Sequence, residues 1–184
     1  MVVVYNCYKK TKCIKLIEEE IVLKTQENLM AAFAGESQAN RKYLAYAEQA
    51  EKEGHAGIAR LFRATAEAET IHALAEFKIA GKVNSTAENL QDGIDGETYE
   101  FSTMYPEFLE AAKKEGHTAA ANAFHMALEA EKVHAVLYKD ALANIDTAHD
   151  VDYYLCPVCG YIHKGSAPEV CPICHAKASV FKKY

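Results

Sequence analysis

Two short motifs in the sequence combine residue types and a spacing that suit metal binding. They are Glu69-x-x-His72 and Glu131-x-x-His134. On a helix, residues three apart project from the same face, so the carboxylate and the imidazole of each motif can bind one metal ion. A single motif of this kind is more often a solvated helix face. Its repetition favours a metal site, because coordination neutralises carboxylates that are costly to bury.

The repetition belongs to an internal duplication. Residues 25–36 recur as residues 86–97, at an offset of 61 positions, and one residue is then gained, so that later positions match at an offset of 62. The matched pairs include Thr25 and Thr86, Gly35 and Gly96, Glu36 and Glu97, Tyr43 and Tyr105, Phe62 and Phe124, Glu69 and Glu131, and His72 and His134. Two similar helical hairpins predict a pseudo-twofold four-helix bundle, in which a site on the axis is built from both halves.

The helices that pair with the two motifs each supply one more carboxylate, Glu36 and Glu97. Together these residues are the ligand set of ferritin-like two-metal bundles. Carboxylates plus imidazole, with open positions, suit iron or manganese better than a structural zinc. Glu100 lies one turn after Glu97, and the first half has no acidic residue at its equivalent place. A surplus carboxylate motivates the hypothesis that ligands exchange as the charge on the metal changes.

Helical patterns predict the elements that position these residues. We expect helices near 26–53, 56–80, 87–115 and 118–145, with Pro106 as the point where the third helix could kink. Thr25 and Thr86 are predicted N-caps, each with a glutamate in the following turn. His55 and His117 stand at helix starts, where capping or exposure is expected. The fold class is therefore all-α.

Four regions follow from this pattern. Residues 1–24 are an N-terminal extension of unclear role, in which Ile14 to Leu23 could form a short helix. Residues 25–145 form the ferritin-like bundle, 146–153 a polar linker and 154–184 a cysteine-rich domain. Cys7 and Cys13 lie outside all motifs, and a surface thiol role or none is expected for them. His125 and His149 receive no role.

The cysteine-rich domain contains two C-P-x-C motifs. Their cysteines are Cys156, Cys159, Cys171 and Cys174. Four thiolates in so short a segment predict a tetrahedral metal site, and spacing alone slightly favours a structural zinc over a single iron. Because about thirty residues cannot fold on apolar burial alone, the metal would be the core of this domain.

Composition excludes several classes of partner. The formal net charge of −6 disfavours nucleic acid and anionic membranes as partners, since both need a basic surface. No apolar run approaches the length of a membrane span. The N-terminus places its lysines after a brief apolar stretch, an order that does not fit a secretory signal, so we expect a cytoplasmic protein.

The motifs together resemble the rubrerythrin family, and the resemblance covers the chain from about Thr25 to its end. It is carried by the segments Phe33-Ala34-Gly35-Glu36-Ser37-Gln38, Glu69-x-x-His72, Gly96-Glu97-Thr98-Tyr99-Glu100, Met104-Tyr105-Pro106, Glu131-x-x-His134, and Tyr154 through the four cysteines to Phe181. The resemblance implies a di-iron site, and it implies iron in the rubredoxin-like four-cysteine site, with zinc as a substitute.

The resemblance also implies roles for individual residues. In the oxidised state the ligands would be Glu36, Glu69, Glu97, Glu100, Glu131 and His134. His72 and Glu100 would exchange on one iron as the site cycles. Tyr43 and Tyr105 could donate hydrogen bonds to the ligand carboxylates, although each could equally be a core tyrosine. Members are typically homodimers or larger, with the rubredoxin-like centre of one chain near the di-iron site of another.

The implied function is a peroxidase of oxidative-stress defence, which reduces hydrogen peroxide to water. Electrons would come through the rubredoxin-like iron from a separate reductase or rubredoxin, and ultimately from a nicotinamide nucleotide, for which this chain has no G-x-G-x-x-G site. Ferroxidase or iron storage is the alternative function, and a zinc-containing structural protein ranks third. His175 departs from the family pattern, since a glycine commonly follows the last cysteine and adopts a left-handed backbone more easily.

Overall fold

The computed structural model describes residues 10–147 and 151–184, and for residues 10–23 it describes the backbone alone. Predictions for Cys7 and His149, and for the side chain of Cys13, lie outside the described residues. The chain divides into two compact units, the first ending at Val83 and the second beginning at Asn84. Each unit contains one copy of the duplication.

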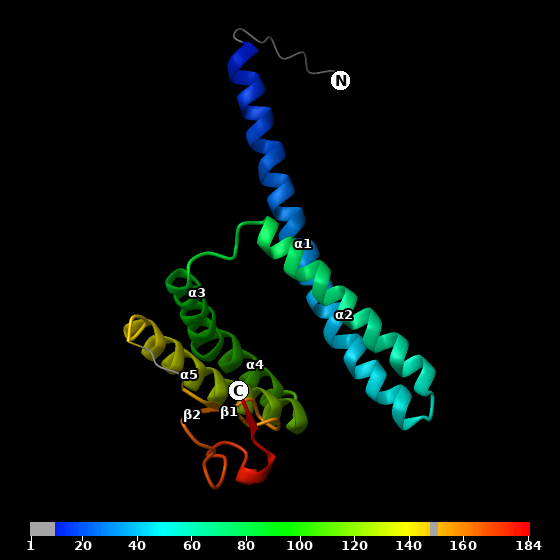
Figure 1. Cartoon of the computed structure of the whole chain (residues 1–184), viewed down its shortest axis with the longest axis vertical. Coiled ribbons are helices and arrows are strands. Elements are labelled where there is room, and N and C mark those ends of the chain that lie inside the picture. The colour runs from blue at the N-terminus through cyan, green and yellow to red at the C-terminus, as the bar shows by residue number, and fades with distance from the viewer. Residues whose placement is uncertain (1–9, 148–150) are drawn as a thin grey trace. The chain divides into compact units, whose positions relative to one another are not determined.

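The first unit is a helical hairpin of α1 (Lys10–Lys52) and α2 (Ala56–Ile79), which run side by side in Figure 1. Gly54, with a φ of +82°, makes the turn between them. The prediction that Thr25 caps a helix is wrong, because α1 begins at Lys10 and continues through Thr25. A hydrogen bond of 3.1 Å from the Gln26 amide to the Ala80 carbonyl marks where α2 ends beside α1.

The two helices of this hairpin approach each other along a line of small side chains. Every buried residue among the described side chains of this unit is an alanine: Ala47, Ala50, Ala59, Ala66, Ala73 and Ala80. In α2 these alanines recur every seven residues, which keeps them on one seam facing α1. The larger apolar side chains of the hairpin are therefore left partly or fully exposed.

The second unit begins with α3 (Thr86–Tyr99), a π-helical turn η1 (Glu100–Met104) and α4 (Tyr105–Lys114). Ser85 is the N-cap of α3, one residue before the predicted Thr86, and it forms a capping box with Glu88. The single helix expected over 87–115 is thus interrupted by η1. Within η1 the N–H of Tyr105 donates to the carbonyl of Glu100, five residues earlier. The interruption lies just before Pro106, which stands in the first turn of α4, where its missing N–H costs little.

Helix α5 (Thr118–Ala143) packs against α3 and α4 and completes the second hairpin (Figure 1). His117 is its N-cap, and the imidazole accepts a hydrogen bond from the Ala120 N–H at 3.2 Å, so the capping prediction is confirmed for this histidine. His55 stands at the corresponding place before α2 but makes no side-chain capping bond.

Aromatic packing repeats between the two hairpins. In the first, Tyr43, Tyr46 and Phe62 form a cluster whose three centroid distances are 6.2, 6.2 and 5.6 Å. In the second, Tyr105, Phe108 and Phe124 stand at the matching positions, with distances of 6.3, 6.3 and 5.6 Å. The duplication seen in the sequence is therefore a duplication of packing as well.

The C-terminal part of the second unit is a small three-stranded antiparallel sheet in the order β2-β1-β3, with a short 3₁₀ turn, η2 (Ala178–Val180). Its strands are β1 (Tyr153–Leu155), β2 (Ile162–Lys164) and β3 (Lys182–Lys183). It lies against α5, where Lys164 forms an ion pair with Asp140. The predicted all-α fold with a small C-terminal cysteine domain is confirmed. Within the part of the chain described, no helix has the length and apolarity to cross a bilayer.

Candidate metal centres

The first hairpin brings together three of the predicted ligands. Ligand atoms of Glu36, Glu69 and His72 all lie within 4.8 Å of one another. The Nδ1 of His72 is 3.1 Å from Oε2 of Glu69, and both come from α2, whereas Glu36 comes from α1. A hydrogen bond shared with Glu69, together with burial and the charge of Glu69, raises the pKa of Glu36. Such carboxylate crowding is relieved by a cation.

Glu76 is a neighbour of this cluster that the sequence did not point to. It lies one turn after His72 on α2, and its negative charge contributes to the raised pKa of Glu36. Its Oε2 atom is buried and has no hydrogen-bond partner within the described residues. A buried carboxylate oxygen without a partner is costly, so this hairpin needs a further group, a cation or a donor, at this place.

The second hairpin repeats the arrangement with more burial. Glu97 from α3, and Glu131 and His134 from α5, have ligand atoms within 4.8 Å of one another. The Nδ1 of His134 is 2.6 Å from Oε2 of Glu131 and 3.8 Å from Oε2 of Glu97. Burial, a hydrogen bond to Glu131 and the charge of Glu131 raise the pKa of Glu97 to about 7. The hydrogen bond from His134 lowers the pKa of Glu131.

The other ring nitrogen of His134 decides how the imidazole can act. Nε2 lies 2.9 Å from the carbonyl oxygen of Gly160. A carbonyl only accepts hydrogen bonds, so Nε2 carries a proton. Nδ1, which donates to Glu131 here, is the nitrogen whose lone pair would bind a metal once its own proton is displaced. A backbone carbonyl is one of the usual partners that fix the tautomer of a metal-binding histidine. With two acidic residues beside Nδ1, the donor set fits iron.

Glu100 and Tyr105 lie close to the carboxylates of the second hairpin, whereas Tyr43 of the first hairpin packs among aromatic rings. Glu100 is the first residue of η1, and its pKa is raised by burial and then by the charge of Glu131. Burial and the charges of Glu100, Glu131 and Glu97 raise the pKa of Tyr105, so its phenol stays protonated beside these carboxylates. Tyr43 packs on Phe62, and no hydrogen bond from it to a carboxylate is present among the described contacts.

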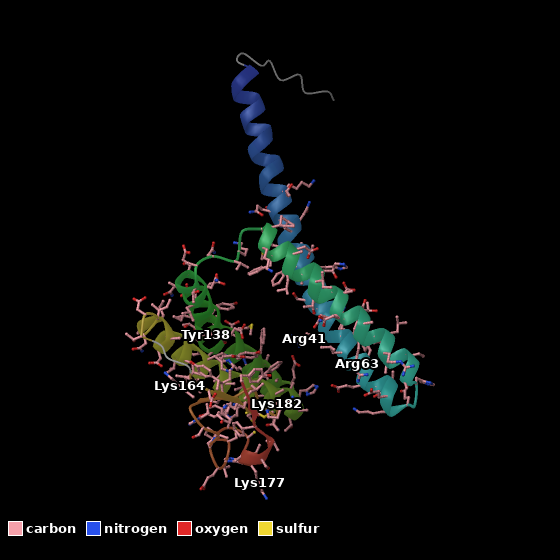
Figure 2. All side chains as sticks on the ribbon, in the orientation of Figure 1. Arg41, Arg63, Tyr138, Lys164, Lys177 and Lys182 are labelled. Carbon is pink, nitrogen blue, oxygen red and sulfur yellow. The ribbon has the colours of Figure 1, made fainter. Side chains whose placement is uncertain are left out.

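Tyr138 is a second residue that sequence analysis missed. It lies one turn after His134 on α5 (labelled in Figure 2), and burial and the charges of Glu97 and Glu131 raise its pKa. Its ring lies so close to Gly93 that a Cβ there would meet it at 3.1 Å. At the offset of 62, Tyr138 matches Glu76. The two halves therefore differ at this position, so the duplication alone does not single out either residue.

The four cysteines form the third cluster. Their sulfur atoms lie within 4.8 Å of one another, and the pairs Cys156 with Cys174 and Cys159 with Cys171 are 3.5 Å apart. A tetrahedron with metal–sulfur bonds of about 2.3 Å has edges of about 3.8 Å, so the geometry fits a single four-coordinate metal. His175 has a left-handed backbone, with a φ of +61°, although it carries a Cβ.

Comparison with known proteins assigns this combination of clusters to a family. The family model described as Rubrerythrin matches residues 27–142, and the one described as Rubrerythrin, rubredoxin-like domain matches residues 154–182. The chain belongs to the rubrerythrin family. Its members are oxidoreductases, and the clusters are the candidate di-iron and rubredoxin-like iron sites of that family.

Individual relatives resemble most of the chain. Nigerythrin of Nitratidesulfovibrio vulgaris is 43% identical over 174 residues, which cover 87% of this chain and 86% of that protein. Rubrerythrin-2 of Clostridium acetobutylicum is 38% identical over 177 residues, 87% of this chain and 96% of that protein. The structure of partially reduced nigerythrin matches with a TM-score of 0.55 and 43% identity, and covers 87% of this chain and 86% of its own.

Proposed function

We propose that this rubrerythrin-family protein is a peroxidase that reduces hydrogen peroxide to two waters at a di-iron site. The observation that carries the proposal is the pair of matching clusters, Glu36 with Glu69 and His72, and Glu97 with Glu131 and His134. Each cluster supplies half of a six-residue ligand set, to which Glu100 adds a seventh. The chemistry that a bound di-ferrous pair supplies is a two-electron reduction of the O–O bond.

The residues around the site handle charge and protons. Reduction of one peroxide consumes two electrons and two protons and yields two waters. The carboxylates that would hold the metals are those of Glu36, Glu69, Glu97 and Glu131. Tyr105 stays protonated beside Glu100, so its O–H can donate a hydrogen bond to a carboxylate or to bound peroxide. We further propose that His72, whose side chain is 57% exposed, would be an exchangeable ligand, with Glu100 as the carboxylate that would take its place.

Electrons would reach the site from the iron at the four cysteines. Gly160 follows the ligand Cys159, and its carbonyl accepts the hydrogen bond from His134. The bonds from Cys159 through Gly160 to His134 form a short route from the four-cysteine centre to a di-iron ligand of the same chain. A storage protein needs no such one-electron relay, which favours the peroxidase over iron handling. The initial donor would be a separate reductase or rubredoxin in the cytoplasm.

The test is anaerobic stopped-flow mixing of the fully reduced, iron-loaded protein with one equivalent of hydrogen peroxide, and separately with oxygen. We expect rapid reoxidation by peroxide, with one peroxide consumed per two electrons, and a much slower reaction with oxygen. Cys156→Ser serves as the control for the relay, since it should keep the peroxide reaction but lose re-reduction through the rubredoxin-like domain. Faster oxidation by oxygen than by peroxide, or zinc at the cysteines of protein from iron-replete cells, would contradict the proposal.

A further inference from the structure

We infer that two copies of this chain exchange helical hairpins, so that each di-iron site is built from α1 and α2 of one copy and α3, α4 and α5 of the other. The inference rests on the proposed di-iron site and adds where its two halves come from. The observation behind it is the length of the connection between α2 and α3.

A ferritin-like bundle requires a long connection at this point. Its four helices include one crossover that runs the length of the bundle, so that the helices before and after it point in the same direction. In this chain α2 ends at Ile79 and α3 begins at Thr86, which leaves the six residues 80–85 between them.

The required span follows from where the ligands lie on their helices. His72 lies seven residues before the end of α2, about 10 Å along the axis, and Glu97 lies eleven residues after the start of α3, about 16 Å. For parallel helices with their ligands at one level, these lengths add to about 27 Å. A sideways step of about 10 Å between neighbouring axes raises the span to roughly 29 Å.

The connection cannot reach that far. Seven Cα steps from Ile79 to Thr86 span at most about 25 Å when fully extended. Much of the segment is not extended, because Gly81 and Lys82 donate backbone hydrogen bonds to Lys78 and Phe77 and wind around the end of α2. At its other end, Ser85 is held by the capping box of α3. A single chain therefore cannot close the ferritin-like topology on itself without unwinding these caps.

Among the side chains described from residue 24 onward, the first hairpin has no core of large apolar residues. Those that are buried are alanines, while Leu61, Ile71 and Ile79 of α2 expose 65%, 63% and 71% of their surface. Two helices with only alanines between them do not form a stable layer, so the hairpin needs another element to pack against. The buried Oε2 of Glu76, which has no hydrogen-bond partner among the described residues, shows that this hairpin also lacks a polar or cationic group.

The second unit offers the matching surface. An open groove of about 590 Å³ is lined by apolar side chains including Leu90, Leu137, Leu155 and Ile162, with Glu97 and His134 also in its wall. A groove that combines an apolar lining with half of a metal site fits an occupant that brings apolar side chains and the other half. The first hairpin of a second copy has this chemistry.

Complementation between two site variants tests the exchange. One variant carries Glu36→Ala and Glu69→Ala, and the other carries Glu97→Ala and Glu131→Ala, so that each loses the equivalent two carboxylates. The two are co-expressed with different tags, and dimers that contain both are isolated by sequential affinity steps. Iron content and the visible spectrum of the di-iron site are then measured, with the four-cysteine iron as an internal check that each chain is folded.

Exchange predicts that the mixed dimer regains half of the wild-type di-iron content, because one of its two sites receives both intact hairpins. Each variant alone should bind none there. No recovery in the mixed dimer, while wild-type protein binds two irons at the site, would overturn the exchange. Wild-type protein without di-iron would instead overturn the proposed function.

A longer connection provides the second measurement. About 12 Gly and Ser residues inserted between Val83 and Asn84 add up to ~40 Å of reach, enough to close the bundle within one chain. In that background we expect the recovery in mixed dimers to fall well below half. Recovery that stays at half with the longer connection would show that the short segment does not dictate exchange, against the inference.

Discussion

The Nε2 atom of His134 lies 2.9 Å from the carbonyl oxygen of Gly160, which links a proposed di-iron ligand to the backbone beside Cys159. The resemblance to the family implies that the rubredoxin-like centre of one chain lies near the di-iron site of another. Here the small domain lies against α5 of its own chain, at the half-site that α5 itself carries. If hairpins are exchanged, the other half of that site comes from a second copy. The rubredoxin-like centre would then lie beside α5 of its own chain and also beside a di-iron site that the second copy helps to form.

Replacing Gly160 by alanine should weaken this link. The φ of +83° at Gly160 is costly for any residue with a Cβ, by roughly 1–2 kcal/mol, whereas the nearest neighbour of the new Cβ, Ala130, lies at an ordinary 3.8 Å. We expect the four-cysteine centre to form, with slower electron transfer from it to the di-iron site. Stopped-flow re-reduction of the oxidised protein measures this.

Gly165→Ala is the matched control for Gly160→Ala. Gly165 has a φ of +96°, and a methyl group added there would have no neighbour within 4 Å, so the substitution carries a similar backbone cost and leaves the Gly160 carbonyl untouched. Both variants should lose comparable stability of the small domain, and Gly165→Ala should keep the wild-type electron-transfer rate. Equal electron-transfer rates in the two variants would show that the Gly160 carbonyl has no part in electron transfer.

Deleting Ser102 should remove the π-helical turn without unfolding the hairpin. The second copy of the duplication is one residue longer than the first between Glu97 and Tyr105, and a π turn is the way a helix absorbs one extra residue. The first hairpin folds without that residue, so the deletion variant should keep its helical circular dichroism and its four-cysteine iron. If the turn positions Glu100 at the di-iron site, the deletion should slow oxidation of the reduced protein by peroxide.

Ser102→Ala is the control for the deletion, because it keeps the chain length and changes an exposed side chain. It should leave both folding and the peroxide reaction unchanged. A deletion variant that reacts with peroxide at the wild-type rate would show that η1 has no role in the reaction. Loss of helical structure in the deletion variant would show that η1 has a structural role.

Much of the fold and site follows from the duplication. Because Glu-x-x-His recurs with its partner glutamate, the sequence predicts two hairpins and the two clusters that they hold. The change of offset from 61 to 62 also indicates the π turn. A helix that keeps its ends in register can include one extra residue only by changing its hydrogen-bond pattern. The sequence shows the extra residue, but Pro106, a few positions later, is the residue type that favours a kink.

Other features depend on contacts that spacing does not encode. Glu76 and Tyr138 lie one turn beyond the histidines, but a lone glutamate or tyrosine on a helix is no signal without knowledge of its neighbours. Thr25 has the residue type of a cap, yet helix-forming residues before it continue α1 across it. The division of the chain after Val83 depends on which surfaces pack together, which local patterns do not specify.

The N-cap of α3 offers a direct test of one such boundary. Ser85 accepts a hydrogen bond from the N–H of Glu88, and the Glu88 carboxylate accepts one from the N–H of Ser85. Ser85→Ala should therefore lower the free energy of unfolding by about 1 kcal/mol. Thr86→Ala, at the predicted cap one residue later, should change it by less than about 0.5 kcal/mol. Urea denaturation of the metal-free variants followed by circular dichroism measures both, and a larger loss for Thr86→Ala would reverse the assignment.

His175→Gly should stabilise the four-cysteine domain. The two cysteine motifs fold alike: the N–H of Gly160 donates to the Cys156 carbonyl, and the N–H of His175 donates to the Cys171 carbonyl. Both donors have positive φ, +83° for Gly160 and +61° for His175, but only the first is a glycine. A left-handed residue with a Cβ costs roughly 1 kcal/mol or more, so glycine at position 175 should raise the free energy of unfolding of this domain by about 1 kcal/mol.

The measurement is denaturant-induced loss of the iron–thiolate absorption, compared among wild-type protein, His175→Gly and His175→Ala. Alanine keeps the Cβ and removes only the imidazole, which is exposed, so it should leave the midpoint near that of the wild type. If alanine stabilises the domain as much as glycine does, the strain lies in the imidazole and not in the backbone. Stabilisation by glycine alone would show that this chain tolerates a strained second cysteine motif where its first motif has none.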